Sequence, residues 1–207
     1  FTIFVTEKYQ YKHKIDILPR NDVEKINSFL RALKVKKKDE EISSFDLSTY
    51  KKCFIVQAKR KSEHYSPEES GANFYSYLKK YKDIKKVDFC VDSLDFDKDK
   101  IATFFSEFLF GMNLKSYKFN KYKTLNKDKI NQNVNFSIIS SNATKIENKY
   151  KYFHAIKEGV FLTRDLVSEP PNVLNPKPYV NEIKKLSRIG LKIKVYNERE
   201  MKKLGLN

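Results

Sequence analysis

Apolar residues recur along the chain with two alternating periods, one typical of strands and one typical of helices. Short runs rich in β-branched and aromatic residues predict strands at Phe1–Val5, Ile15–Leu18, Cys53–Ala58, Val87–Val91, Val134–Ile139 and Leu191–Tyr196. Helical patterns lie between these runs. Alternating strands and helices indicate an α/β layer built on a mixed, largely parallel sheet.

The helical patterns differ in length and in their end signals. The clearest follows Asp97, where one apolar stripe contains Ile101, Phe104, Phe105, Phe108 and Leu109. Further helices are predicted after Asn21 and Asp22, from Pro67-Glu68-Glu69, from about Asn142 to Pro170, at Tyr179–Leu186 and around Glu198–Leu204. The helix from Asn142 is long enough to join two domains.

Prolines mark the boundary that follows the long helix. Pro170, Pro171, Pro176 and Pro178 crowd together where the helix pattern stops. We therefore divide the chain into an N-terminal domain at 1–141, a linker helix and hinge at 142–169, and a final segment at 170–207. The final segment is predicted to form a helix, a strand and a short helix, the first elements of an α/β domain. These elements cannot form a core alone and should expose apolar surface.

The charge of the chain raises the question of a polyanionic partner. The net charge is +16, but only six of the 42 basic residues are arginine, the residue that bidentate readers of bases and phosphates favour. An AT-rich coding sequence would also produce an excess of Lys, Asn, Ile, Tyr and Phe, and we prefer that interpretation.

One segment nevertheless combines basic and aromatic side chains. In the stretch 115–129, Lys115, Lys118, Lys121, Lys123, Lys127 and Lys129 are interleaved with Tyr117, Phe119 and Tyr122. Residues in such a pattern can bind a nucleic-acid strand, because lysines attract its phosphates and aromatic rings stack on its bases. The alternative is a solvated loop in a Lys-rich protein, which we favour.

Residues for catalysis or metal binding are sparse. The histidines His13, His64 and His154 show no ligand spacing, and the acidic run from Asp95 to Asp99 lacks the Gly and terminal Glu of a calcium loop. No G-x-S-x-G motif occurs, and five glycines cannot build a phosphate-cradling loop. We therefore assign no catalytic, metal-binding or cofactor-binding residue.

The remaining sequence features concern the cellular setting. Cys53 and Cys90 each lie in an apolar run and are expected to be buried thiols rather than a disulfide, which fits a reducing cytoplasm. No apolar stretch approaches the roughly 20 residues of a membrane span, and no signal peptide begins the chain. The absence of an initiator Met fits a fragment. We expect a cytoplasmic protein with no membrane partner.

Three segments resemble leucyl (cytosol) aminopeptidases. The run Phe161-Leu-Thr-Arg-Asp-Leu-Val-Ser-Glu-Pro-Pro-Asn-Val-Leu-Asn-Pro176 resembles the hinge where their interdomain helix ends. Leu191–Gly205 is similar to their next strand and helix, which ends in Glu-x-x-Met-x-x-Leu-Gly, and Tyr117–Thr124 is similar to their Tyr-x-Phe-x-x-Tyr-Lys segment. The strong resemblance covers residues 117–205. Ser168 departs from it, because many members have Asn there.

The resemblance implies a macro-domain-like α/β domain with a mixed sheet flanked by helices, a long interdomain linker helix, and the start of a truncated α/β catalytic domain. It implies a parent enzyme that removes N-terminal amino acids from peptides with two divalent ions, zinc or manganese, and assembles as a homo-hexamer. The family's Lys- and Asp-bearing Gly-rich segment and its Asn-Thr-Asp-Ala-Glu-Gly-Arg segment occur nowhere in this sequence. We therefore expect the chain alone to be inactive and to need the remaining catalytic domain.

Two alternatives stay open beside this interpretation. Some members of the resembled family bind DNA as regulators, so the chain could be a stand-alone DNA- or RNA-binding module that uses the stretch 115–129. A macro-like fold could also bind ADP-ribose, although the sequence has almost no glycine to build that loop.

Overall fold

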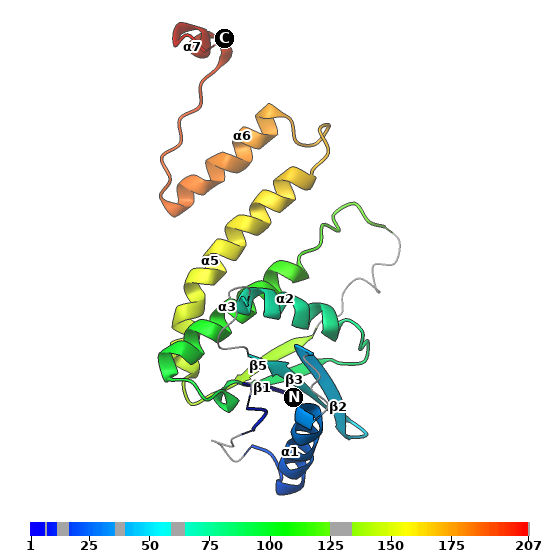
Figure 1. Cartoon of the computed structure of the whole chain (residues 1–207). Helices are drawn as coiled ribbons and strands as arrows, with labels where there is room; N and C mark the ends of the chain where they lie inside the picture. Colours follow the sequence, from blue (N-terminus) through cyan, green and yellow to red (C-terminus); the bar gives the residue numbers. More distant parts are fainter. Residues whose placement is uncertain (7, 12–16, 36–39, 59–64, 125–133, 207) are drawn as a thin grey trace. The chain divides into compact units, whose positions relative to one another are not determined.

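The computed structural model describes the whole chain except residues 7, 12–16, 36–39, 59–64, 125–133 and 207 (Figure 1). Its strands are β1 (Thr2–Val5), β2 (Ile42–Ser48), β3 (Lys51–Gln57), β4 (Lys86–Cys90) and β5 (Asn135–Ile139). Its helices are α1 (Arg20–Val35), α2 (Pro67–Leu78), α3 (Lys98–Ser116), α5 (Ala143–Ser168), α6 (Pro176–Lys185) and α7 (Glu198–Lys203), with 3-10 turns at Val91–Ser93 and Leu186–Ile189. The chain forms two compact units, Phe1–Gly159 and Val160–Asn207.

The first unit is built on one five-stranded sheet with the order β2-β3-β1-β4-β5. The pairs β1–β3, β1–β4 and β4–β5 are parallel, and only the hairpin partners β2 and β3 are antiparallel. The predicted mixed, largely parallel sheet is therefore confirmed. The central strand β1 is buried along its whole length, as expected of a strand covered on both faces.

Helices cover both faces of this sheet (Figure 1). On one face, Phe4, Phe54 and Phe89 pack with α2, α3 and the first turns of α5 in an aromatic core, where rings lie edge to face. On the other face, side chains from β1 and β3 pack against Ile26 and Leu30 of α1. The sheet is therefore the middle layer of a three-layer domain.

Two glycines allow α2 and α3 to pack at very short range. A Cβ atom placed on Gly71 would lie 1.9 Å from the carbonyl oxygen of Phe108, and one on Gly111 would lie 1.8 Å from the carbonyl oxygen of Glu68. No real side chain tolerates such a distance, so the close contact of the two helices requires glycine at both positions.

A buried carboxylate joins the end of the sheet to the long helix. Asp92, which is 3% exposed just after β4, accepts a hydrogen bond from the Ser140 hydroxyl and another from the Ser141 backbone N–H, both at 2.6 Å. Charge-assisted bonds of this kind are the stronger class. They hold the turn between β5 and α5 against the end of β4.

The long helix α5 and the second unit bury little. In α5 only Ile146 is buried, and in α6 and α7 no residue is. A helix of 26 residues is roughly 39 Å long. Most other apolar residues of α5 are half-buried, and Ile156 is 38% exposed.

The structure contains one strand that was not predicted, and it differs from two of the strand predictions. Strand β2 was not predicted, because its sequence ISSFDLS is too polar for an apolar run; it is an edge strand with an alternating pattern. The predicted strand Ile15–Leu18 lies partly outside the described residues, and Ile17 and Leu18 are not in a strand. The predicted strand Leu191–Tyr196 is wrong: residues 191–197 are neither helix nor strand, and none of the described strands pairs with them.

The remaining elements follow the predictions within a few residues. The helix after Asp97 is α3, and the Asp97 side chain accepts a hydrogen bond from the Lys100 backbone N–H at its N-terminus. The predicted helix beginning at Pro67 is α2. The two compact units meet inside α5, between Gly159 and Val160, which is neither of the proposed domain boundaries. The division into 1–141, 142–169 and 170–207 remains a prediction.

Candidate functional site

In the structure, His154 and the acidic residues Asp97 and Asp99 make contacts that are common at helix surfaces and helix ends. His154 lies on α5, half exposed, with Nε2 3.8 Å from a carboxylate oxygen of Glu158. Asp97 caps α3, and Asp99 forms an ion pair with Lys145. His13 and His64 lie outside the described residues. Among the residues that are described, no three His, Cys, Asp or Glu side chains form a group that could hold a metal ion.

Both cysteines are buried free thiols, as predicted. Burial raises the pKa of Cys53 to about 12 and raises the pKa of Cys90 as well. The Cys90 sulfur lies 3.8 Å from the Tyr11 hydroxyl, within the core between the sheet and α1. A nucleophilic cysteine needs a lowered pKa and access to solvent, so neither thiol is suited to catalysis.

The stretch 115–129 is described only in part. Lys115 closes α3, and Lys118, Lys121 and Lys123 follow it, while Lys127 and Lys129 lie outside the described residues. The Lys121 ammonium lies 5.6 Å from the centre of the Tyr122 ring, and the Phe119 and Tyr122 rings are 5.8 Å apart. Within the described part of this stretch, Tyr122 therefore contacts both Lys121 and Phe119.

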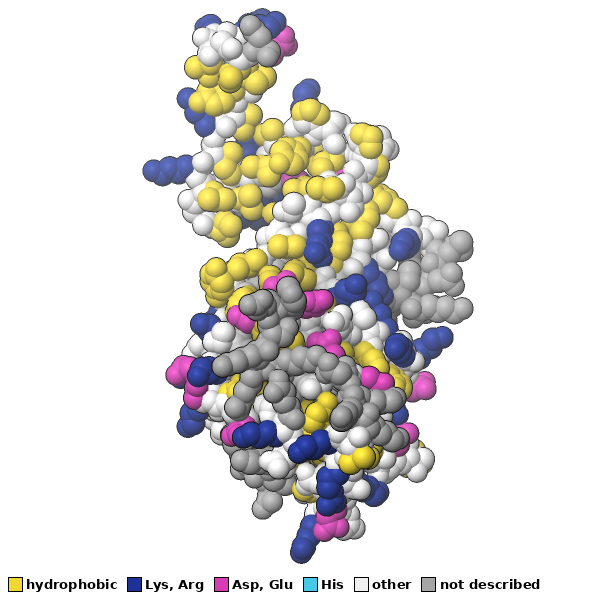
Figure 2. All heavy atoms as spheres, in the orientation of Figure 1, with side chains coloured by type: hydrophobic (Ala, Val, Ile, Leu, Met, Phe, Trp, Pro, Cys, Tyr) yellow, Lys and Arg dark blue, Asp and Glu magenta, His cyan; other side chains and the backbone are white. Residues whose placement is uncertain are grey.

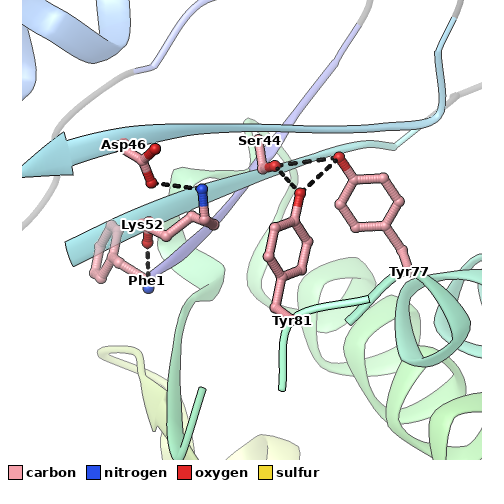
Figure 3. A network of polar contacts seen from close by, with 6 residues as sticks. All are labelled: Phe1, Ser44, Asp46, Lys52, Tyr77 and Tyr81. Atoms are coloured by element: carbon pink, nitrogen blue, oxygen red, sulfur yellow. Dashed lines mark hydrogen bonds and ion pairs between the residues drawn. The ribbon is translucent and has the colours of Figure 1, made fainter. Parts of the chain in front are cut away.

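A second group of polar side chains lies where α2 ends beside the β2–β3 hairpin (Figure 3). The Ser44 hydroxyl of β2 lies 3.1 Å from the Tyr77 hydroxyl and 2.9 Å from the Tyr81 hydroxyl, and Tyr81 donates to Tyr77 at 3.5 Å. We call Ser44, Tyr77 and Tyr81 the hydroxyl cluster. Tyr77 lies in the last turn of α2, and Tyr81 follows three residues after the helix ends at Leu78.

Lysines surround the hydroxyl cluster. The Lys52 ammonium lies 5.0 Å from the centre of the Tyr81 ring, and the Lys80 ammonium lies 4.7 Å from the centre of the Tyr77 ring. Lys52 also forms an ion pair with Asp46 at 2.5 Å, and its backbone carbonyl accepts a hydrogen bond from the amino group of Phe1 (Figure 3). Cations held over tyrosine rings are attracted by the negative ring face.

The pKa values of the two tyrosines diverge for identifiable reasons. Hydrogen bonds with Ser44 and Tyr77 lower the pKa of Tyr81, and the charges of Lys52 and Lys80 lower it further. Burial raises the pKa of Tyr77. If one phenol of the pair ionises, it is therefore Tyr81.

The positive charge continues along the ends of α2 and α3. The Lys79 ammonium lies 4.6 Å from the centre of the Tyr75 ring. Its pKa is lowered by burial and then by the charges of Lys118 and Lys115, so these ammonium groups repel one another. We call Lys79, Lys80, Lys115 and Lys118 the lysine group. Within the described part of the chain, no carboxylate pairs with Lys79, Lys80 or Lys115.

Sequence reasoning missed this site. Its local signal was present, because Tyr75, Tyr77 and Tyr81 alternate with Lys79 and Lys80 just as aromatic and basic residues alternate in the stretch 115–129. The contribution of Ser44 could not be found, because strand β2 was not predicted.

No protein-family model matches the chain, but individual proteins do. A probable cytosol aminopeptidase of Phytoplasma mali is 36% identical over 142 residues, which is 67% of this chain and 28% of that protein. A probable cytosol aminopeptidase of Rhizobium etli is 35% identical over 130 residues, 61% of this chain and 26% of that protein. The chain thus matches little more than a quarter of the length of these relatives.

Solved structures show the same fold. A mutant of tomato leucine aminopeptidase superposes with a TM-score of 0.71 at 20% identity, covering 99% of this chain and 43% of that one. The bottromycin maturation enzyme BotP superposes with a TM-score of 0.61 at 14% identity, covering 99% of this chain and 41% of that one.

Fold and sequence together define the class of protein. The five-stranded mixed sheet flanked by helices is an α/β domain of the kind found in aminopeptidases of this type. The chain is a relative of the leucyl (cytosol) aminopeptidase family and corresponds to its N-terminal part.

Proposed function

We propose that the chain is the N-terminal part of a metal-dependent leucyl aminopeptidase and that its unit Val160–Asn207 docks on the catalytic part of that enzyme. The kinship with cytosol aminopeptidases supports the enzyme class. In this proposal the complete enzyme hydrolyses N-terminal amino acids from peptides in the cytoplasm and assembles as a homo-hexamer, and the chain alone is inactive.

The observation that carries the docking proposal is the apolar surface of the second unit. Ile189 is 76% exposed, and Leu191, Val195 and Leu204 are each more than 40% exposed. Figure 2 shows hydrophobic side chains on the surface of α6 and of the segment that follows it. Apolar side chains gathered in this way are typical of a surface that another part of a protein covers.

The metal ions of the proposed enzyme belong to its catalytic part. The described residues of this chain contain no set of ligands for them, so they do not fit a two-ion centre. The structure of BotP in complex with Mn belongs to a protein of the same fold. For the complete enzyme we propose two divalent ions, zinc or manganese. No step of catalysis is assigned to residues of this chain.

An activity assay tests the assignment of catalysis. The purified 207-residue chain is incubated with a leucine amide in the presence of Zn²⁺ or Mn²⁺, and leucine release is measured. We expect no release above the metal-only control. Metal-dependent release that increases with the concentration of the chain would show that catalytic residues lie within it, and the proposal would be wrong.

A binding assay tests the docking surface. The catalytic part of the Phytoplasma mali relative, immobilised on a resin, should retain the chain, and Ile189→Asp should abolish retention. The matched control is Val35→Asp, because Val35 is 83% exposed but lies on α1 in the first unit. Equal retention of both variants would contradict docking through the second unit.

The alternative of a DNA- or RNA-binding module that uses the stretch 115–129 stays a prediction. Its support is the contact of Lys121 with Tyr122. Binding through this stretch should weaken steeply with salt, and Lys→Glu changes at Lys118, Lys121 and Lys123 should weaken it. Unchanged affinity in those variants would remove this site.

In the described part of the chain, no helix is both long enough and apolar enough to cross a membrane.

A further inference from the structure

The end of α2 brings hydroxyl and ammonium groups together on rigid elements. The hydroxyl cluster contributes three hydroxyls whose oxygen atoms lie 2.9 to 3.5 Å apart. Lys52 and Lys80 lie over two of its rings, and the rest of the lysine group lies along the ends of α2 and α3. We propose that the hydroxyl cluster, together with Lys52 and Lys80, is a binding site for a phosphate group. This proposal is independent of the aminopeptidase assignment.

The charges decide that the ligand is an anion. Three converging hydroxyl oxygens could in principle hold a cation, but the Lys52 and Lys80 ammonium groups, over the Tyr81 and Tyr77 rings, place two positive charges at the cluster. The hydroxyl protons can turn outward and donate to an oxyanion, and lysine binds phosphate as a point charge. A phosphate group matches the site because it offers several acceptor oxygens to several donors at once.

Two carboxylates oppose the binding of an anion at this site. Asp46 pairs with Lys52, and the negative charge of Glu40 raises the pKa of Tyr77. The Asp46 side chain is 69% exposed, so it can rotate into solvent when a phosphate group replaces it at Lys52. Asp46 therefore competes with the ligand, and its removal should strengthen binding.

The lysines at the helix ends have a structural role as well, because cations near a helix C-terminus stabilise the helix. That role does not require three hydroxyls, nor ammonium groups crowded until they repel one another. The two roles make different predictions. A purely structural lysine changes stability equally in phosphate and in chloride, whereas a ligand contact changes the response to phosphate alone.

The test is a titration of the 207-residue chain with inorganic phosphate, with sodium chloride keeping the ionic strength constant, followed by thermal unfolding. Binding to the folded state should raise Tm in a saturable way, by about 3 to 6 °C at ten times the Kd. Lys80→Gln and Tyr81→Phe should each raise the Kd about tenfold, because each removes a contact with a charged ligand.

Two further variants sharpen the test. Asp46→Asn should lower the Kd several-fold. Lys98→Gln should leave it unchanged, because Lys98 makes the same charge change at the opposite end of α3. A wild-type Tm equal in phosphate and chloride would overturn the proposal, and so would unaltered phosphate binding in both Lys80→Gln and Tyr81→Phe.

The phosphate group can belong to a free phosphate compound or to a nucleic-acid backbone, and competition separates these sources. If a single-stranded oligothymidylate displaces inorganic phosphate and binds far more tightly per molecule, the natural ligand is a phosphodiester. If phosphate binds and the oligonucleotide does not compete, the ligand is a small phosphate compound.

Discussion

The contact between α2 and α3 can be broken by a single methyl group. In Gly71→Ala the new Cβ would lie 1.9 Å from the carbonyl oxygen of Phe108 and 2.8 Å from its carbonyl carbon. Both are backbone atoms, so no side chain can rotate away. The helices must separate by about 1.5 Å to bring this contact from 1.9 Å to the 3.4 Å of ordinary van der Waals contact, which loosens the core between Phe74 and Phe108.

Two opposing terms set the size of the effect. Overpacking of a close-packed core costs about 3 kcal/mol when backbone must move. The higher helix propensity of Ala over Gly returns about 1 kcal/mol. The net loss is therefore about 2 kcal/mol, which for a domain of this size lowers Tm by roughly 4 to 8 °C.

Thermal unfolding followed by circular dichroism measures this loss, and the chain provides its own control. Gly159 lies in α5, and a Cβ atom placed on it would have no other atom within 4 Å, so Gly159→Ala carries the propensity gain without the clash. We expect Gly71→Ala to lower Tm and Gly159→Ala to leave it unchanged or raise it. If Gly71→Ala unfolds at or above the wild-type temperature, the two helices do not pack as described.

Further predictions concern single polar groups. Asp92→Asn should lower the free energy of unfolding, measured in urea, by about 1 to 3 kcal/mol, because an amide has one acceptor oxygen and Asp92 uses two. An unchanged free energy of unfolding would mean that other contacts hold Ser140. Burial raises the pKa of Cys53 from 9.0 to about 12. The contribution of this thiol to stability is therefore present below pH 9 and lost as the pH rises toward 12. At pH 8, dithiodipyridine should modify Cys53 only after the chain unfolds. Asp97→Ala should lower the free energy of unfolding at pH 7, because the variant loses the side-chain cap of α3. The backbone N–H of Lys100 lowers the pKa of Asp97, so the capping contribution is lost as the pH falls through that lowered pKa, and the variant and wild type should converge there.

The sequence predicts those helices and strands in which buried apolar residues recur in a regular pattern. Ile101, Phe104, Phe105 and Phe108 repeat at the helical period, and all four are buried in α3. The same holds for the buried strands β1 and β3, whose apolar runs are continuous because both faces of the sheet are covered.

Prediction fails where pairing, rather than burial, forms the element. Strand β2 lies at an edge and is half polar, so its sequence is not an apolar run, yet pairing with β3 holds it in the sheet. Residues Leu191–Tyr196 show the reverse, because an apolar run without a neighbouring strand stays outside the sheet.

The hydroxyl cluster shows a third limit of sequence reasoning. Ser44 meets Tyr77 and Tyr81 across more than 30 residues of chain, and only the packing of α2 against the β2–β3 hairpin brings them together. The Asp92 contacts with Ser140 and Ser141 also join segments far apart in the sequence. Each residue is ordinary in its local sequence, so a site of this kind becomes visible only in the folded chain.

The central claim, that this chain is the N-terminal part of a leucyl aminopeptidase, is tested most directly by reading the coding sequence that follows the codon for Asn207. We predict an open frame that continues into a Gly-rich segment bearing Lys and Asp and then into Asn-Thr-Asp-Ala-Glu-Gly-Arg. A stop codon directly after Asn207, or a frame that continues without these segments, would contradict the claim.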